Sequence, residues 1–186
     1  ELARLLEGGD GKADEDVEVA PTELESVKPE ALAIIEESDR VVVQFSGGKD
    51  STVALNWTRG VCERLNKPLT ALFVETGAEF PDLTAHVIRI CERLGVELVL
   101  LQPRENILAH YMAKREWPNS IFRDCLHKFI NDPVNRYLRQ FENEKVICVR
   151  GGRSDQKTAV SKSDIYQEVK DGNRVVRLLN PFFGIP

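Results

Sequence analysis

The chain has 186 residues, enough for one domain with a substantial core, and its 42% hydrophobic and 30% charged residues are typical of a globular protein. It contains no apolar run of the ~18–20 residues that cross a bilayer and no signal-peptide pattern, so we expect neither a membrane protein nor a secreted one. The net charge of −5 is uneven, because residues 1–30 carry ten acidic and three basic residues and residues 31–186 carry +2. The slight excess of positive charge in residues 31–186 suits a small anionic ligand. The absence of a dense basic stripe makes nucleic acid an unexpected partner.

The first 29 residues predict an acidic arm or linker. This segment lacks apolar periodicity, and Pro21 and Pro29 interrupt it. An acidic surface for a partner is the alternative interpretation. Residues 30–186 then form the domain, beginning with a short helix after Pro29.

Beyond Arg40, short apolar strands and amphipathic helices alternate. This alternation predicts right-handed crossovers and an α/β fold, with a doubly wound, mostly parallel sheet between two helical layers. A C-terminal β-hairpin is expected from strands at 165–169 and 175–179 around Asp171-Gly172-Asn173. The other expected strands are Val41–Phe45, Leu69–Val74, Glu97–Leu101 and Lys145–Arg150, and the main expected helices are 50–66, 81–94, 104–116 and 125–141.

The cysteines Cys62, Cys91, Cys125 and Cys148 stand far apart and form no C-x-x-C pair. This spacing argues against a local zinc or iron–sulfur motif, and we predict no protein-bound metal site of that kind. A few scattered thiols in a sizeable core indicate a reducing, cytoplasmic setting.

The loop Ser46–Ser51 joins the first strand to a helix, and its residues predict a phosphate site. Gly47 and Gly48 allow a tight turn with backbone N–H groups near a ligand, and the following helix N-terminus favours an anion. Lys49 adds a positive charge, whereas Asp50 either caps the helix or orients Mg²⁺ or the loop itself. Serine hydroxyls at both ends of the loop add further donors.

Two familiar phosphate-binding patterns do not fit this loop. The Walker pattern needs glycine at Val43 and a hydroxyl residue at Asp50, and the dinucleotide pattern needs a third glycine. The sequence Ser46-Gly47-Gly48-Lys49-Asp50-Ser51 instead matches S-G-G-x-D-S, the loop of the PP-loop ATP pyrophosphatases. A tight, merely structural β–α turn is the alternative.

Within that superfamily, three further stretches resemble the phosphoadenosine phosphosulfate (PAPS) reductase family. Residues 75–81 resemble its D-T-G-x-x-F-P, residues 151–156 resemble its G-x-R-x-x-E, and Arg123, Cys125 and Pro133 resemble its R-x-C…P element. The resemblance covers roughly residues 38–183 and implies an adenine nucleotide alpha hydrolase-like fold. Departures include Glu75 for aspartate and Gln156 for glutamate.

The resemblance also implies roles for individual residues. The Ser46–Ser51 loop would hold the pyrophosphate or sulfo-phosphate end of a nucleotide, with Lys49 in a catalytic role. Thr76 and Gly77 would lie near the adenosine, and Gly152 and Arg153 near a phosphate or sulfate oxygen. Cys125 either handles sulfur or is a structural cysteine at a helix start, and its positive neighbours favour a nucleophilic thiol.

These roles imply an enzyme of sulfur metabolism that acts on a sulfonucleotide (adenylyl sulfate or phosphoadenylyl sulfate), or on ATP with Mg²⁺ and release of pyrophosphate. The family's sulfonucleotide reductases carry a C-terminal E-C-G-x-H-like segment that this chain lacks, so we expect a domain truncated at Pro186 or a different reaction. A thiol reductant protein, a further domain or a second copy of the chain are the expected partners. The alternatives are a nucleotide-binding module that needs another subunit for activity, and a PP-loop sulfurtransferase or adenylyltransferase.

Overall fold

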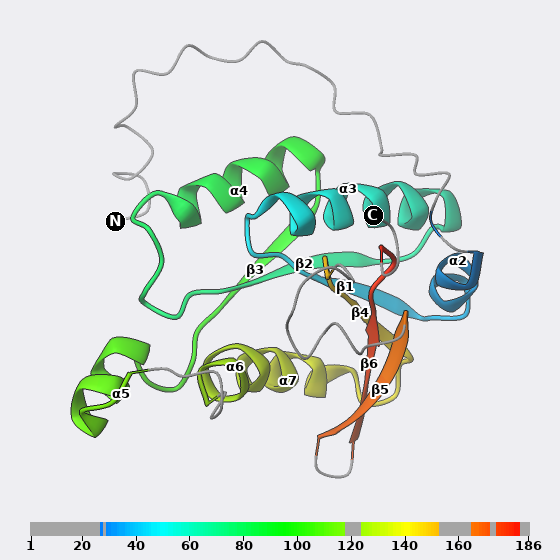
Figure 1. The fold of residues 1–186 in the computed structure, drawn as a ribbon. Coiled ribbons are helices and arrows are strands. Elements are labelled where there is room, and N and C mark those ends of the chain that lie inside the picture. Colours follow the sequence, from blue (N-terminus) through cyan, green and yellow to red (C-terminus); the bar gives the residue numbers. More distant parts are fainter. Residues whose placement is uncertain (1–26, 28, 118–123, 153–164, 172–173, 183–186) are drawn as a thin grey trace, which may run out of the picture.

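A six-stranded sheet organises the computed structural model, which describes residues 27, 29–117, 124–152, 165–171 and 174–182 (Figure 1). The strand order is β3-β2-β1-β4-β6-β5, with every neighbouring pair parallel except the antiparallel hairpin of β5 and β6. The predicted α/β class and mostly parallel sheet are therefore confirmed. The strands are β1 (Arg40–Gln44), β2 (Leu69–Val74), β3 (Glu97–Leu101), β4 (Val146–Val149), β5 (Tyr166–Asp171) and β6 (Arg174–Leu179).

Helices cover both faces of the sheet, as the doubly wound prediction requires (Figure 1). On one face lie α3 (Lys49–Leu65) and α4 (Leu83–Leu94), with α2 (Pro29–Glu36) beside α3. On the other lie α5 (Ile107–Lys114), α6 (Asp124–Leu126) and α7 (Asp132–Leu138). The chain thus winds from β1 through α3 and α4 to β3, then returns to the other side of β1 with β4.

The core has two parts because side chains on a strand alternate between its faces. Val41 and Val43 of β1 are fully buried in the part beneath α3 and α4, whereas Val42 is buried in the part beneath α7. Each β1 valine loses its whole accessible surface, which contributes about 2 kcal/mol per side chain. This burial holds β1 in the interior of the sheet, so the start of the loop that follows β1 is held in one position.

The helical stretch predicted over 125–141 exists, but it is not one regular α-helix. Between α6 and α7, a π-helical turn (His127–Asn131) carries an Asp132 N–H to His127 carbonyl bond, and a short 3₁₀ turn (Arg139–Phe141) follows α7. Pro133 has no N–H to donate to the Phe129 carbonyl, so the regular bond pattern is interrupted at this point. Periodicity alone predicts a helix here without predicting the wider turn.

The predicted hairpin is also present, and the structure shows where it lies in the sheet. β6 does not stand apart from the sheet, because it pairs in parallel with β4, with Cys148 opposite Leu178. The hairpin therefore extends the sheet by two strands. Of the predicted acidic arm, residues 1–26 and 28 lie outside the described residues.

Candidate functional site

The loop after β1 is held in shape by its own two serines. The Ser51 hydroxyl accepts a hydrogen bond from the Ser46 backbone N–H at 3.2 Å, lies 3.0 Å from the Ser46 hydroxyl, and donates to the Gly48 carbonyl at 2.9 Å. Gly47 has a φ of +76°, a conformation that favours glycine. A methyl group there would lie 2.9 Å from Leu83, so α4 packs directly against the loop.

The loop leads into the N-terminus of α3, a helix of 17 residues. Gly48 is the N-cap residue, and it has no side chain with which to cap the helix. Lys49 follows as an exposed first helical residue, and Asp50 is the acidic residue of the first turn. A helix that begins with glycine and lysine presents positive charge, which suits an anionic ligand.

The loop after β4 touches this helix start at backbone level. A Cβ atom on Gly151 would lie 2.6 Å from the Asp50 carbonyl oxygen and 2.7 Å from the Ser51 nitrogen. Only glycine allows the two backbones to approach this closely. Because β1 and β4 are neighbours in the sheet and the chain winds outward from them in opposite directions, this contact marks the point where the strand order reverses.

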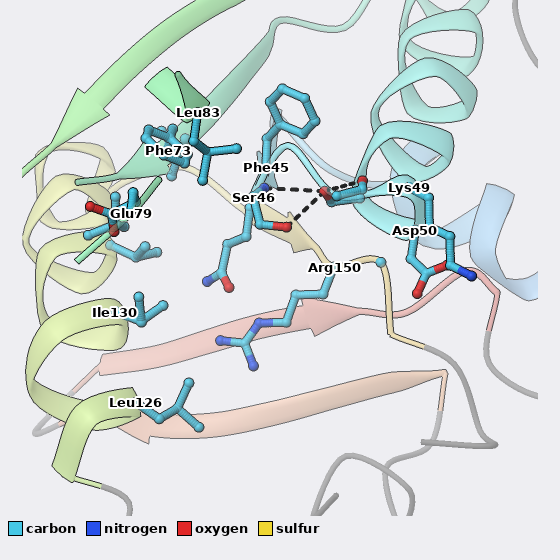
Figure 2. Close-up of a pocket in the computed structure, with 17 residues that line it drawn as sticks. Phe45, Ser46, Lys49, Asp50, Phe73, Glu79, Leu83, Leu126, Ile130 and Arg150 are labelled. Atoms are coloured by element: carbon cyan, nitrogen blue, oxygen red, sulfur yellow. Dashed lines mark hydrogen bonds between the residues drawn. The ribbon is translucent and has the colours of Figure 1, made fainter. Parts of the chain in front are cut away.

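A cavity of about 640 Å³ opens at this point (Figure 2). It has a polar end formed by the Ser46–Ser51 loop, and apolar walls from β2, α4 and the α6–α7 segment. A cavity of this size suits a small-molecule ligand. The lining residues are Gln44, Phe45, Ser46, Gly48, Lys49, Asp50, Ser51, Leu72, Phe73, Val74, Glu79, Leu83, Leu126, Ile130, Val134, Arg150 and Gly151.

Glu79 lines the cavity and organises the loop after β2. Its carboxylate accepts hydrogen bonds from the Thr76 N–H at 2.9 Å, the Thr76 hydroxyl at 2.5 Å and the Gly77 N–H at 2.9 Å. Burial disfavours the charged form, but these hydrogen bonds outweigh it and hold the pKa of Glu79 below its ordinary value. The carboxylate is therefore a fixed negative charge that shapes the loop.

The structure brings together only part of the predicted site. Ser46, Gly48, Lys49, Asp50 and Ser51 line the cavity. Gly47 shapes the loop without lining the cavity, and Gly152 follows the lining residue Gly151. Thr76 and Gly77 do not line the cavity either, but their N–H groups donate hydrogen bonds to Glu79, which does. Arg153, Arg123 and Gln156 fall outside the described residues.

Cys125 is half-buried in α6 and does not line the cavity, although its neighbour Leu126 does. The other three cysteines are buried in the core. Burial raises the pKa of Cys62 to about 12 and that of Cys91 to about 11, and it also raises the pKa of Cys148. These three thiols are therefore neutral packing groups at pH 7.

Sequence reasoning missed Glu79 and Arg150. Glu79 stands inside the T-G-x-x-F-P-like stretch, where its acceptor role could be suspected from the turn that surrounds it. Arg150 stands at the end of an apolar strand, directly before a glycine pair, and a charged residue at that position could have indicated a binding site. Both side chains line the cavity, Arg150 directly after β4 and Glu79 from the loop between β2 and α4 (Figure 2).

Among the residues that the structure describes, no group of three or more metal-ligating side chains forms a metal site. Among the described residues, Asp50 and Glu79 supply the carboxylates that line the cavity. Mg²⁺ that arrives on a nucleotide needs only one or two protein carboxylates, since phosphate oxygens and water supply its other ligands. The donor set thus fits a nucleotide-borne cation rather than a protein-built cage.

In the described part of the chain, no helix is long and apolar enough to cross a membrane.

Comparison with known proteins places this geometry in a family. The model of the phosphoadenosine phosphosulfate reductase domain matches residues 40–184. Sulfate adenylyltransferase subunit 2 of Mycobacterium sp. (strain JLS) is 32% identical over 147 residues, which are 77% of this chain and 45% of that protein. The chain spans less than half the length of the curated relatives that it matches.

Two solved structures share the fold at low sequence identity. The phosphoadenylyl-sulfate reductase of Candida auris superposes with a TM-score of 0.55 at 14% identity, over 82% of this chain and 71% of that chain. The FMN adenylyltransferase of Candida glabrata superposes with a TM-score of 0.54 at 14% identity, over 83% and 52%. The architecture is therefore that of the adenine nucleotide alpha hydrolase-like proteins. Because the family model matches most of the chain, including the loop, the cavity walls and the strands that carry them, this protein belongs to the PAPS reductase domain family.

Proposed function

We propose that the chain binds ATP in the cavity and takes part in adenylyl transfer with release of pyrophosphate, as a PP-loop enzyme of sulfur metabolism. The observation that carries the proposal is the position of the loop. The Ser46–Ser51 loop and the N-terminus of α3 form the polar end of a cavity whose remaining walls are mostly apolar. A nucleotide has the same division, with a polyanionic end and a flat, largely apolar base.

The proposed orientation follows from this division. The β- and γ-phosphates lie at the loop, near Lys49 and the backbone N–H groups that begin α3. The adenine base lies against the wall formed by Phe73, Val74 and Leu83, beside the loop that Glu79 holds (Figure 2). The α-phosphate then lies between the two, facing the open part of the cavity.

In the proposed reaction, an oxygen atom of the acceptor attacks the α-phosphorus. A new oxygen–phosphorus bond forms while the bond to the bridging oxygen breaks, and pyrophosphate leaves with that electron pair. Lys49 and the helix N-terminus stabilise the charge that develops on the leaving group. Mg²⁺ bound to the nucleotide would add further neutralisation of that charge.

The name of one relative supports the adenylyl-transfer branch, whereas the family model is named for the reductase. Sulfate adenylyltransferase subunit 2 is the name carried by the Mycobacterium relative, and that name also describes a multi-subunit protein. A further subunit or domain is therefore part of the proposal for this chain. The four free cysteines support a reducing compartment such as the cytoplasm.

A binding and product panel tests the proposal. ATP, adenylyl sulfate and phosphoadenylyl sulfate are titrated into the purified chain by calorimetry, and pyrophosphate and sulfite are assayed afterwards with a thiol reductant present. Pyrophosphate formed from ATP supports adenylyl transfer, whereas sulfite formed from a sulfonucleotide replaces it with the reductase branch. ATP binding without turnover, and turnover on addition of a longer chain or partner subunit, identifies a nucleotide-binding module. Failure of all three nucleotides to bind refutes the proposal.

A further inference from the structure

Strand β3 is one of the two outer strands of the sheet, because in the described structure it pairs with β2 alone (Figure 1). The Leu101 carbonyl accepts a hydrogen bond from the Glu75 N–H at 2.8 Å, so the backbone groups of Leu101 face β2. Backbone direction alternates along a strand, and the N–H and C=O groups of Leu98 and Leu100 therefore face away from β2. These groups form a hydrogen-bonding edge that no described strand occupies.

The opposite outer strand, β5, is protected against pairing in a way that β3 is not. β5 carries the exposed Glu168 and Lys170, and charged side chains on an edge strand discourage the addition of another strand. β3 reads Glu97-Leu98-Val99-Leu100-Leu101, with one charge at its first position and half-buried aliphatic residues after it. An aliphatic edge of this kind is open to a partner strand.

A groove of about 360 Å³ lies beside the end of β3. Leu100 and Leu101 both line it, and because consecutive residues of a strand point to opposite faces, the groove opens along the strand edge. In strand addition, main-chain hydrogen bonds at an edge give affinity and a pocket for a side chain gives specificity. The remaining lining residues come from the end of β3, from α7 and from the 3₁₀ turn after it, namely Gln102, Pro133, Arg136, Tyr137 and Gln140.

The charges beside the groove favour an acidic side chain. Nε of the exposed Arg104 lies 3.6 Å from Oδ2 of Asp132, and Nε of Arg136 lies 3.1 Å from the same oxygen. Two guanidinium groups thus share one carboxylate, which leaves this end of β3 positive. Glu97 is exposed at the other end of β3, on the α7 face, because it alternates with Leu98. A strand that is acidic at one end and basic at the other is complementary to an antiparallel copy of itself.

From these observations we infer that β3 is a dimer interface, at which a second copy of the chain adds its own β3 in antiparallel orientation. A two-fold axis at Val99 places Leu98 of one copy opposite Leu100 of the other, and their outward N–H and C=O groups form reciprocal hydrogen bonds. The same axis brings Glu97 of each copy to the groove and to Arg104 of the other copy. This self-complementary contact closes at two copies, and it lies outside the cavity of the proposed function.

Sedimentation velocity of the full chain, over about a hundredfold range of concentration, tests the inference. We expect a reversible equilibrium between monomer and dimer, without larger species. Leu100→Pro should weaken the dimer at least about tenfold, because proline removes an N–H group that faces the second copy and leaves those that face β2. Hydrogen exchange followed by mass spectrometry should slow in residues 97–101 as the dimer forms.

Charge reversal at exposed side chains protects the test against a failure of Leu100→Pro to fold. Glu97→Arg and Arg104→Glu should each weaken the dimer at least about threefold, since each brings like charges together at both symmetric contacts. The double variant Glu97→Arg/Arg104→Glu should recover the affinity of the unmodified chain. Lys170→Glu is the matched control, because it makes the same change of charge as Arg104→Glu on the opposite edge strand and should leave the dimer unchanged.

A chain that stays monomeric over the whole range overturns the inference, and the edge is then left to a different protein or segment. A dimer that withstands Leu100→Pro and both single reversals also overturns it, because the interface then lies elsewhere. Failure of the double variant to recover affinity refutes the antiparallel arrangement. Growth into species larger than a dimer contradicts the two-fold contact.

Discussion

Replacing Gly151 by alanine should damage both stability and nucleotide binding, because the new methyl group meets backbone atoms that cannot rotate away. Its Cβ would lie 2.6–2.7 Å from atoms of Asp50 and Ser51, where ordinary contact begins at 3.4 Å, so the two backbones must separate by about 0.7 Å. Overpacking of this kind costs about 1–3 kcal/mol. The smaller entropy of the unfolded alanine chain returns about 0.4–1 kcal/mol, which leaves a net loss near 1–2 kcal/mol.

The assay is urea unfolding followed by circular dichroism, with ATP titrated separately into the folded variant. A displacement of about 0.7 Å at the start of α3 should weaken ATP binding about tenfold. Gly48→Ala is the matched control for stability, because its φ is −80° and the nearest atom to its Cβ lies 3.6 Å away. We expect this control to change stability by less than about 1 kcal/mol. An unfolding midpoint for Gly151→Ala equal to that of the unmodified chain would refute the backbone contact.

Three further predictions follow from the site and the core. Lys49→Ala should weaken ATP binding at least tenfold while leaving the circular dichroism spectrum unchanged, since it removes one charge-assisted contact; equal affinities in calorimetry would contradict the phosphate-loop assignment. Glu79→Gln should lower the free energy of unfolding at pH 7. Because the pKa of the Glu79 carboxyl is lowered below 4.5 in the folded chain, the difference in free energy from the unmodified chain should be complete above about pH 4.5. The difference should shrink as the pH falls through the lowered pKa of the folded chain. Urea unfolding across this range measures it, and a difference independent of pH would argue against the carboxylate's role. Finally, iodoacetamide at pH 8 should modify Cys125 before the three buried cysteines, as mass spectrometry of digests can show, and prior labelling of a core thiol would contradict the packing.

Local signals predicted much of this molecule. The apolar strand 41–45, the glycine pair at 47–48 and the helix after it are specified by neighbouring residues, and the structure places the strand and helix within one residue of the expected bounds. The hairpin at the C-terminus was equally visible, because Asp171-Gly172-Asn173 is a turn signal. These features depend on contacts between residues that are close in sequence.

Features that depend on distant partners could not be predicted in the same way. The pairing of β6 with β4 joins strands separated by a long segment, and no residue pattern in either strand indicates which strand it pairs with. Glu79 looks like any surface glutamate until the fold of its loop places two backbone N–H groups around it. Arg150 likewise looks like an ordinary charge at the end of a strand until the fold places it on the cavity beside the Ser46–Ser51 loop.

The position of β6 also matters while the chain is being synthesised. All four residues of β4 are buried, and β6 covers the side of β4 that β1 does not. β6 begins 25 residues after β4 ends, so a chain emerging from the ribosome exposes an apolar strand edge until β6 has been synthesised. Such an edge is a template for pairing with other chains. Premature termination before Arg174 should therefore yield insoluble protein rather than a smaller soluble domain.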